Sequence, residues 1–183
     1  MTKSKSPSNK PLAIETLMAD HRKVEDLFVQ YESAKEAEDE SRNEIAASIC
    51  NELTVHATIE EEIFYPWLRE TLDEDDMEMV EEAQVEHNGA KDLIAQIEGA
   101  SEVDAEFDAK VKVLSEYIKH HVKEEENEIF PSVADEREAL DELGQELEAR
   151  KAELKEELGI EEGGKAPASR KPAPDSRKGA TRQ

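Results

Sequence analysis

The sequence predicts an all-α protein in which four helices form an up-down-up-down bundle and a fifth helix follows. Composition is the first observation: of the 183 residues, 38% are charged, only 4% are aromatic, and glycine and proline occur seven times each. Such a composition favours helix over strand. The second observation is apolar residues recurring at helical spacing in five segments. The third is an internal repeat, which pairs the first four segments into two helical hairpins.

The first hairpin is expected from residues 12–35 and 42–70, each of which carries a single apolar stripe. Ser41 and Glu44 have the spacing of a capping box, which places the start of the second helix near residue 42. Pro66 lacks a backbone N–H, so we expect it to kink the last turns of that helix.

The second hairpin is expected from residues 74–98 and 103–130, again with one apolar stripe each. Gly99 is a suitable stop for the third helix, because glycine is common just beyond helix ends. The fourth helix follows the sequence Ser-Glu-Val-Asp, which ends at Asp104.

These features predict four parts of the chain. Residues 1–11 are expected to be disordered, and residues 12–131 to form the bundle. Residues 132–160 are expected to form a helix whose narrow apolar stripe lies against the bundle or mediates self-association. Residues 161–183 are basic, rich in alanine and proline, and lack an apolar face, so we expect a disordered tail.

The charge of the chain is unevenly distributed. The formal net charge is −24, but residues 11–164 alone hold 14 Lys and Arg against 46 Asp and Glu. Such an acidic body repels phosphates and anionic lipids, so neither nucleic acid nor a membrane is expected as a partner. Cys50 is the only cysteine, and the sequence shows neither a signal peptide nor an apolar run of membrane-spanning length. A soluble, cytoplasmic protein is expected.

Four of the five histidines fall one per helix, in the middle of the apolar stripe. His21 and His87 are 66 residues apart, and His56 and His121 are 65 residues apart. Counted from the expected turns near residues 38 and 102, the two arms of each hairpin have similar length. At about 1.5 Å per helical residue, all four histidines therefore lie at nearly the same depth in the bundle.

This arrangement predicts a two-metal site. His56 and His121 are each followed four residues later by a glutamate, which places imidazole and carboxylate on the same helix face. Burying these groups together without a cation would be costly. Two bridging carboxylates and mixed nitrogen and oxygen donors suit iron or manganese better than structural zinc. The candidate metal ligands are His21, His56, Glu60, His87, His121 and Glu125.

These motifs, with the phrases EEEIFYP and ENEIFP that follow them, resemble the hemerythrin family, also known as the HHE cation-binding domain. The resemblance covers about residues 12–131. It implies two non-haem iron ions, joined by an oxygen bridge and the two carboxylates, with manganese or zinc ranked behind iron. Oxygen-carrying members have a further histidine where this chain has Lys91. The resemblance therefore implies sensing or peroxide chemistry rather than oxygen transport.

The sequence leaves three functions open. The protein could bind or sense O₂, NO or iron, which is the function that we favour because no other substrate motif is visible. It could be a di-iron enzyme acting on peroxide or O₂. It could also be an interaction protein with a structural metal site.

Other polar side chains near the motifs receive more ordinary predictions. His120 cannot face the bundle axis together with its neighbour His121, so we expect it to be exposed. Glu61 or Glu124 could accept a hydrogen bond from a ligand imidazole. Aromatic residues that follow the motifs, Tyr65 among them, are expected to pack at the end of the bundle.

Overall fold

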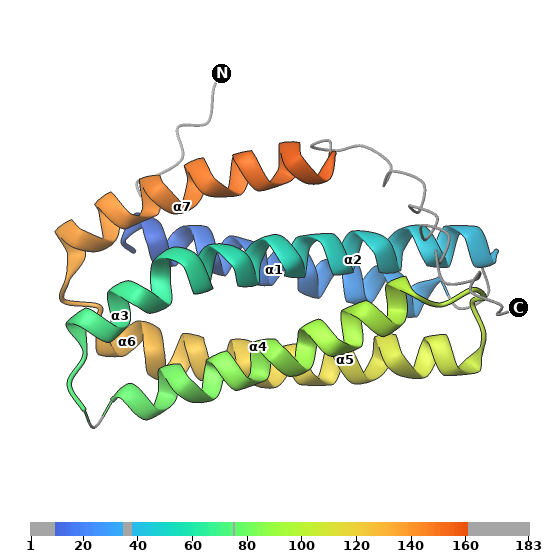
Figure 1. Ribbon diagram of the computed structural model, residues 1–183, viewed down its shortest axis with the longest axis horizontal. Coiled ribbons are helices and arrows are strands. Elements are labelled where there is room, and N and C mark those ends of the chain that lie inside the picture. The colour runs from blue at the N-terminus through green and yellow to red at the C-terminus, as the bar shows by residue number, and fades with distance from the viewer. Residues whose placement is uncertain (1–9, 35–37, 75, 161–183) are drawn as a thin grey trace, which may run out of the picture.

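The computed structural model describes residues 10–34, 38–74 and 76–160, and within these ranges it contains helices and no strand. Its framework consists of four long helices: α1 (Leu12–Ser33), α2 (Asp39–Ile59), α4 (Met77–Glu98) and α5 (Ala105–Glu124). α1 packs against α2 and α5, and α4 packs against the same two helices, so the four helices enclose one core (Figure 1). The predicted all-α bundle with an additional C-terminal helix is confirmed.

Both α2 and α5 continue into a wider, π-helical turn, η1 (Glu60–Phe64) and η2 (Glu125–Ile129), followed by α3 (Tyr65–Thr71) and α6 (Phe130–Ser132). In η1 the N–H of Tyr65 donates to the carbonyl of Glu60, five residues back. A proline follows at once, and in an α-helix its ring would meet the carbonyl four residues earlier. The wider turn relieves this conflict. The disruption that Pro66 predicts is accompanied by a π-helical turn, which ends two residues before the proline.

The helix ends agree only partly with their sequence signals. Asp104 caps α5, because its carboxylate accepts a hydrogen bond from the N–H of Phe107 at 2.9 Å. Gly99 follows the last residue of α4, as predicted. The capping box predicted at Ser41 is wrong, because α2 begins two residues earlier at Asp39 and Ser41 lies within the first turn.

The buried apolar side chains form two clusters, one towards each end of the bundle. On α1, Leu17 belongs to one cluster and Val24 to the other; on α2, the boundary falls between Leu53 and Val55. His21 and His87 lie between the two clusters on their helices, and His56 and His121 lie within two residues of the corresponding boundaries. The core is therefore interrupted at one level, where polar side chains replace hydrocarbon.

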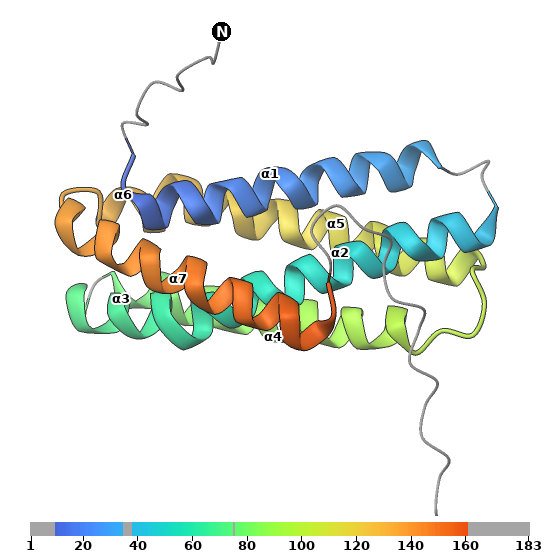
Figure 2. The same ribbon diagram turned by 90° about the horizontal axis from the view of Figure 1, so that it is seen from above.

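The fifth long helix, α7 (Arg137–Leu158), lies across α1 and α2 (Figures 1 and 2). Its buried side facing the bundle consists of Leu140, Leu143, Gly144, Leu147 and Leu154. Of the two predicted roles of this helix, packing against the bundle is observed. The disorder predicted for residues 1–11 and 161–183 falls outside the described residues, except at Lys10 and Pro11, and Pro11 is the N-cap residue of α1. No helix in the described part of the chain is both long and apolar enough to cross a membrane.

Gly144 allows the closest approach between α7 and α1. A Cβ atom at this position would lie 2.5 Å from the backbone nitrogen of Ala13 and 2.7 Å from the carbonyl carbon of Leu12. We predict that Gly144→Ala lowers the free energy of unfolding by about 1–3 kcal/mol, the usual cost of overpacking. Chemical denaturation followed by circular dichroism measures the change. Glu146→Ala, an exposed change on the same helix, should be nearly neutral; equal effects of the two variants would contradict this account.

Candidate metal centre

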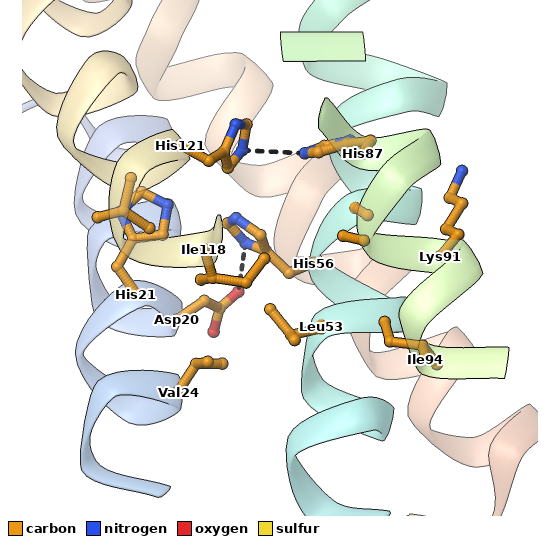
Figure 3. Close-up of a pocket in the computed structure, with 13 residues that line it drawn as sticks. Asp20, His21, Val24, Leu53, His56, His87, Lys91, Ile94, Ile118 and His121 are labelled. Atoms are coloured by element: carbon orange, nitrogen blue, oxygen red, sulfur yellow. Dashed lines mark hydrogen bonds and ion pairs between the residues drawn. The ribbon is translucent and has the colours of Figure 1, made fainter. Parts of the chain in front are cut away.

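The interruption of the core is a compact group of six buried side chains. The four histidines are 2–5% exposed, and Glu60 and Glu125 are completely buried. α1, α2, α4 and α5 each supply one histidine, and the two π-helical turns each begin at one of the glutamates. Figure 3 shows the four imidazoles converging from the surrounding helices. The structure thus brings together all the ligands predicted from the sequence: His21, His56, Glu60, His87, His121 and Glu125.

Each glutamate lies between histidines of the two hairpins. Oε2 of Glu60 is 3.2 Å from Nε2 of His56 and 3.4 Å from Nε2 of His87. Oε2 of Glu125 is 3.2 Å from Nε2 of His21 and 3.5 Å from Nε2 of His121. Both carboxylates are therefore placed to link the two hairpins.

These atoms form two groups that could each hold a cation. The first group contains four residues, and the second contains Glu60 with His87 and His121. Two bonds of about 2.1 Å at a right angle place their donor atoms about 3.0 Å apart. In the second group the two Nε2 atoms are 3.0 Å apart. The separations fit donor atoms that share an ion, with the histidines of each hairpin in a separate group.

The second nitrogen of each imidazole faces a carboxylate outside the group of six. The four Nδ1–carboxylate pairs are His21–Glu126 at 2.9 Å, His56–Asp20 at 3.7 Å, His87–Glu61 at 3.1 Å and His121–Glu86 at 2.8 Å. Such a partner favours a proton on Nδ1 and leaves the lone pair of Nε2 pointing to the centre. The Nε2 atoms of the four histidines and the two carboxylates then converge on one buried point.

The buried polar atoms at the centre lack other partners. Of the eight Nε2 and carboxylate oxygen atoms of the six ligands, five make no hydrogen bond: His21 Nε2, His56 Nε2, Glu60 Oε1, Glu60 Oε2 and Glu125 Oε2. An unsatisfied buried polar group is costly and needs an explanation. Cations at the centre provide one, because they would bind the same lone pairs. The residues present therefore fit a two-metal group.

Comparison with known proteins agrees with this geometry. The sequence profile described as "Hemerythrin HHE cation binding domain" matches residues 12–133.

The chain belongs to the hemerythrin HHE cation-binding family.

A protein named "DNA nickase" from Nostoc sp. (strain PCC 7120 / SAG 25.82 / UTEX 2576) is 29% identical over 147 residues. The alignment covers 79% of this chain but only 40% of that relative, so most of the relative lies outside the shared part. No solved structure gives a significant match.

In this hemerythrin-family chain, the four carboxylates that face the Nδ1 atoms are named the outer carboxylates. Each of them also contacts a basic side chain. The pairs are Glu126–Arg22, Asp20–Lys151, Glu61–Lys91 and Glu86–His120. Each ligand histidine thus contacts a carboxylate, and this carboxylate contacts a basic group nearer the surface. Lys91 occupies the position where oxygen carriers have the further histidine. It pairs with Glu61, and Glu61 in turn faces Nδ1 of His87.

Sequence reasoning found only part of this outer layer. Glu61 was proposed as an acceptor and is one, whereas Glu124 pairs with the exposed His120 at 3.0 Å. Asp20, Glu86 and Glu126 were missed. The repeat carried a signal for them, because an acidic residue precedes His21 and His87 and another follows each ligand glutamate.

Tyr65 was also missed. It was expected to pack at the end of the bundle, but its hydroxyl lies among the ligand atoms, 3.2 Å from Nε2 of His87. By contrast, Tyr117 packs in the apolar cluster beside Gly89. The helical spacing of apolar residues does not distinguish Tyr65 from Tyr117.

An apolar cavity adjoins the centre, and Figure 3 draws the residues that line it. All four ligand histidines line it, and neither Glu60 nor Glu125 does. The rest of its wall is mostly aliphatic and includes Val24, Leu53, Ala90, Ile94, Ile118 and Val122. The cavity therefore provides a hydrophobic space in direct contact with the imidazoles.

Burial and neighbouring charges shift the pKa values of the ligands in opposite directions. Burial raises the pKa of Glu60 well above its ordinary value, and the charge of Glu125 raises it further. Burial opposes ionisation of Glu125 too, but the neighbouring histidines outweigh it and lower the pKa of this carboxyl. Burial lowers the pKa of His21, yet Glu125 and Glu126 outweigh burial and raise that pKa to about 9. His56 has its pKa lowered by burial to about 4.

These pKa values predict that metal binding strengthens with pH. With a pKa of about 9, His21 is protonated in the metal-free protein at neutral pH, so a metal ion must displace that proton. Affinity should rise from pH 6 to pH 9, by up to about tenfold per pH unit for each proton released. Competition with a chelator at several pH values measures this slope. A flat profile between pH 6 and pH 9 would contradict the assignment of His21.

Removing single ligands provides a second prediction. His56→Ala and His121→Ala should each abolish binding of two metal ions, because each change removes one of two histidines facing an ion. His120→Ala is the matched control, since its side chain is 59% exposed and pairs with Glu86 and Glu124, neither of which is a predicted ligand. Metal analysis of the purified variants gives the stoichiometry. Full occupancy in the His121 variant would refute the ligand set.

Proposed function

We propose that the protein binds two non-haem iron ions and uses them to bind or sense O₂, NO or iron. The observation that supports this most strongly is the convergence of four imidazole lone pairs and two carboxylates on one buried point. Imidazole and carboxylate donors without thiolate suit iron or manganese, and a donor set larger than four exceeds what structural zinc uses.

The lining of the cavity favours a small, uncharged ligand. It adjoins all four imidazoles and is otherwise lined mainly by aliphatic side chains, which accommodate a diatomic gas without loss of hydrogen bonds. When bound, the ions would supply the redox and Lewis-acid chemistry. The chain itself would orient the ligand imidazoles through the outer carboxylates and exclude bulk water.

A di-iron enzyme acting on peroxide or O₂ is the second candidate. Lys91 favours it, because this side chain both lines the cavity and pairs with Glu61, which faces His87. An ammonium group in this position could donate a proton to a reduced oxygen species at the edge of the cavity. A structural metal site in an interaction protein is the third candidate.

We propose that nucleic acid is not a partner of this chain, although its relative is named a nickase. The shared part covers 40% of that protein, and residues 11–164 of this chain hold 46 acidic against 14 basic residues, which opposes binding of a phosphate backbone. Self-association through α7 remains a prediction, although its leucines pack on the same chain's bundle.

Spectroscopy of the iron-loaded full chain distinguishes the candidates. For binding or sensing, we expect two irons per chain and an optical spectrum that changes with O₂ or NO and returns when the gas is removed. Sustained loss of added peroxide would favour the enzyme. Stoichiometric zinc in protein from its native host, with no uptake of iron, would contradict both.

The cavity can be tested apart from the ligands. Ile118→Trp should fill it, because Ile118 lines the cavity without being a ligand, and should slow NO binding to the loaded protein by at least about tenfold, or about 1.4 kcal/mol in barrier. Stopped-flow absorbance measures the rate. Val113→Trp, an exposed change on the same helix, should leave the rate unchanged; equal rates in both variants would exclude this cavity as the binding space.

A further inference from the structure

Tyr65 brings an additional oxygen into the centre. The residue is completely buried, and its ring lies beside that of His87 with the centroids 5.2 Å apart. Its hydroxyl is 3.2 Å from Nε2 of His87 and donates to Oε1 of Glu125 at 3.1 Å. Both contacts are made with ligand atoms, whereas the other tyrosines of the described chain lie in the opposite apolar cluster.

The internal repeat is broken at this position. The residue 65 positions after Tyr65 is Phe130, whose ring stacks on His21 with the centroids 5.9 Å apart and the planes within 5°. The two aromatic residues thus lie against equivalent histidines, but only one of them carries oxygen. One half of the centre therefore has a hydroxyl where the other half has hydrocarbon.

The hydroxyl lies in the half that has fewer ligands. Four side chains form the group around His21 and His56, whereas Glu60, His87 and His121 form the other. The contacts of Tyr65, at 3.1 and 3.2 Å, fall in the range of 3.0–3.5 Å found between the ligand atoms themselves. Its oxygen lies between His87 of the three-residue group and Glu125, where it could serve the smaller group as a fourth donor.

We propose that Tyr65 is a seventh ligand, which binds the ion held by His87 and His121 as a phenolate. This inference rests on the proposed two-metal site. On coordination the phenol O–H bond breaks, its electron pair stays on oxygen and binds the ion, and the proton is released to solvent. A hard, anionic oxygen favours the ferric over the ferrous state. The two ions therefore differ in donor set and in reduction potential.

Optical and vibrational spectra of the ferric full chain test the proposal. A ferric phenolate gives a visible charge-transfer absorption, and resonance Raman excitation within it enhances vibrations of the bound tyrosine ring. We expect both signals in the wild-type protein and their loss in Tyr65→Phe, which keeps the ring and removes only the oxygen. Tyr117→Phe is the matched control and should retain both signals, because Tyr117 packs in the apolar cluster.

The outcomes separate the two levels of the proposal. Loss of the signals in Tyr65→Phe supports the ligand whether that variant keeps both irons or only one, since a missing ligand can also weaken binding. Wild-type protein with two irons but no tyrosinate signal overturns this inference and leaves the two-iron site intact. Signals that persist in Tyr65→Phe overturn it as well. Wild-type protein that takes up no iron would instead refute the proposed function.

Discussion

Repulsion among buried lone pairs at one level of the bundle is the constraint on which the rest of the structure depends. Four Nε2 atoms and two carboxylates meet there, and outer carboxylates face the Nδ1 atoms that would otherwise compete for the inward position. Without cations, this arrangement requires protons to be shared among the histidines and glutamates, as the raised pKa of Glu60 indicates. Two cations would relieve the repulsion without moving the helices.

The packing of the bundle keeps these polar side chains in position. Apolar clusters on both sides of the centre hold the four helices at fixed separations, and each π-helical turn begins at the glutamate that reaches inward. Such turns are frequent at functional sites, because they change the direction of side chains within a continuous helix. Here a proline is the second residue after each turn and accounts for the wider winding, so the phrases IFYP and IFP have a structural reason beyond packing.

Sequence reasoning could predict the ligands because helical geometry converts spacing into position. One histidine per stripe, equal hairpin arms and a repeat of 65–66 residues were sufficient to group the six side chains and to expect exposure of His120. The π-helical turns could not be predicted, because proline indicates disruption without specifying its form. Tyr65 and Asp20 depend on contacts between helices, which a stripe on one helix does not reveal. The packing of α7 likewise required knowledge of which face of α1 and α2 remained uncovered.

The repeat duplicates the ligands but not their surroundings. Asp20, behind His56, pairs with Lys151 of α7, and its pKa is lowered to about 2 because His56 and Lys151 outweigh burial. The equivalent Glu86, behind His121, contacts the exposed His120 of α5. α7 thus covers one half of the centre and places an ammonium group behind His56, whereas an imidazole lies behind His121. Because the energy of a bound cation depends on such charges, two ions with matching histidines would experience different electrostatic fields. The asymmetry of this protein therefore arises in the residues around the ligands, where the two hairpins differ.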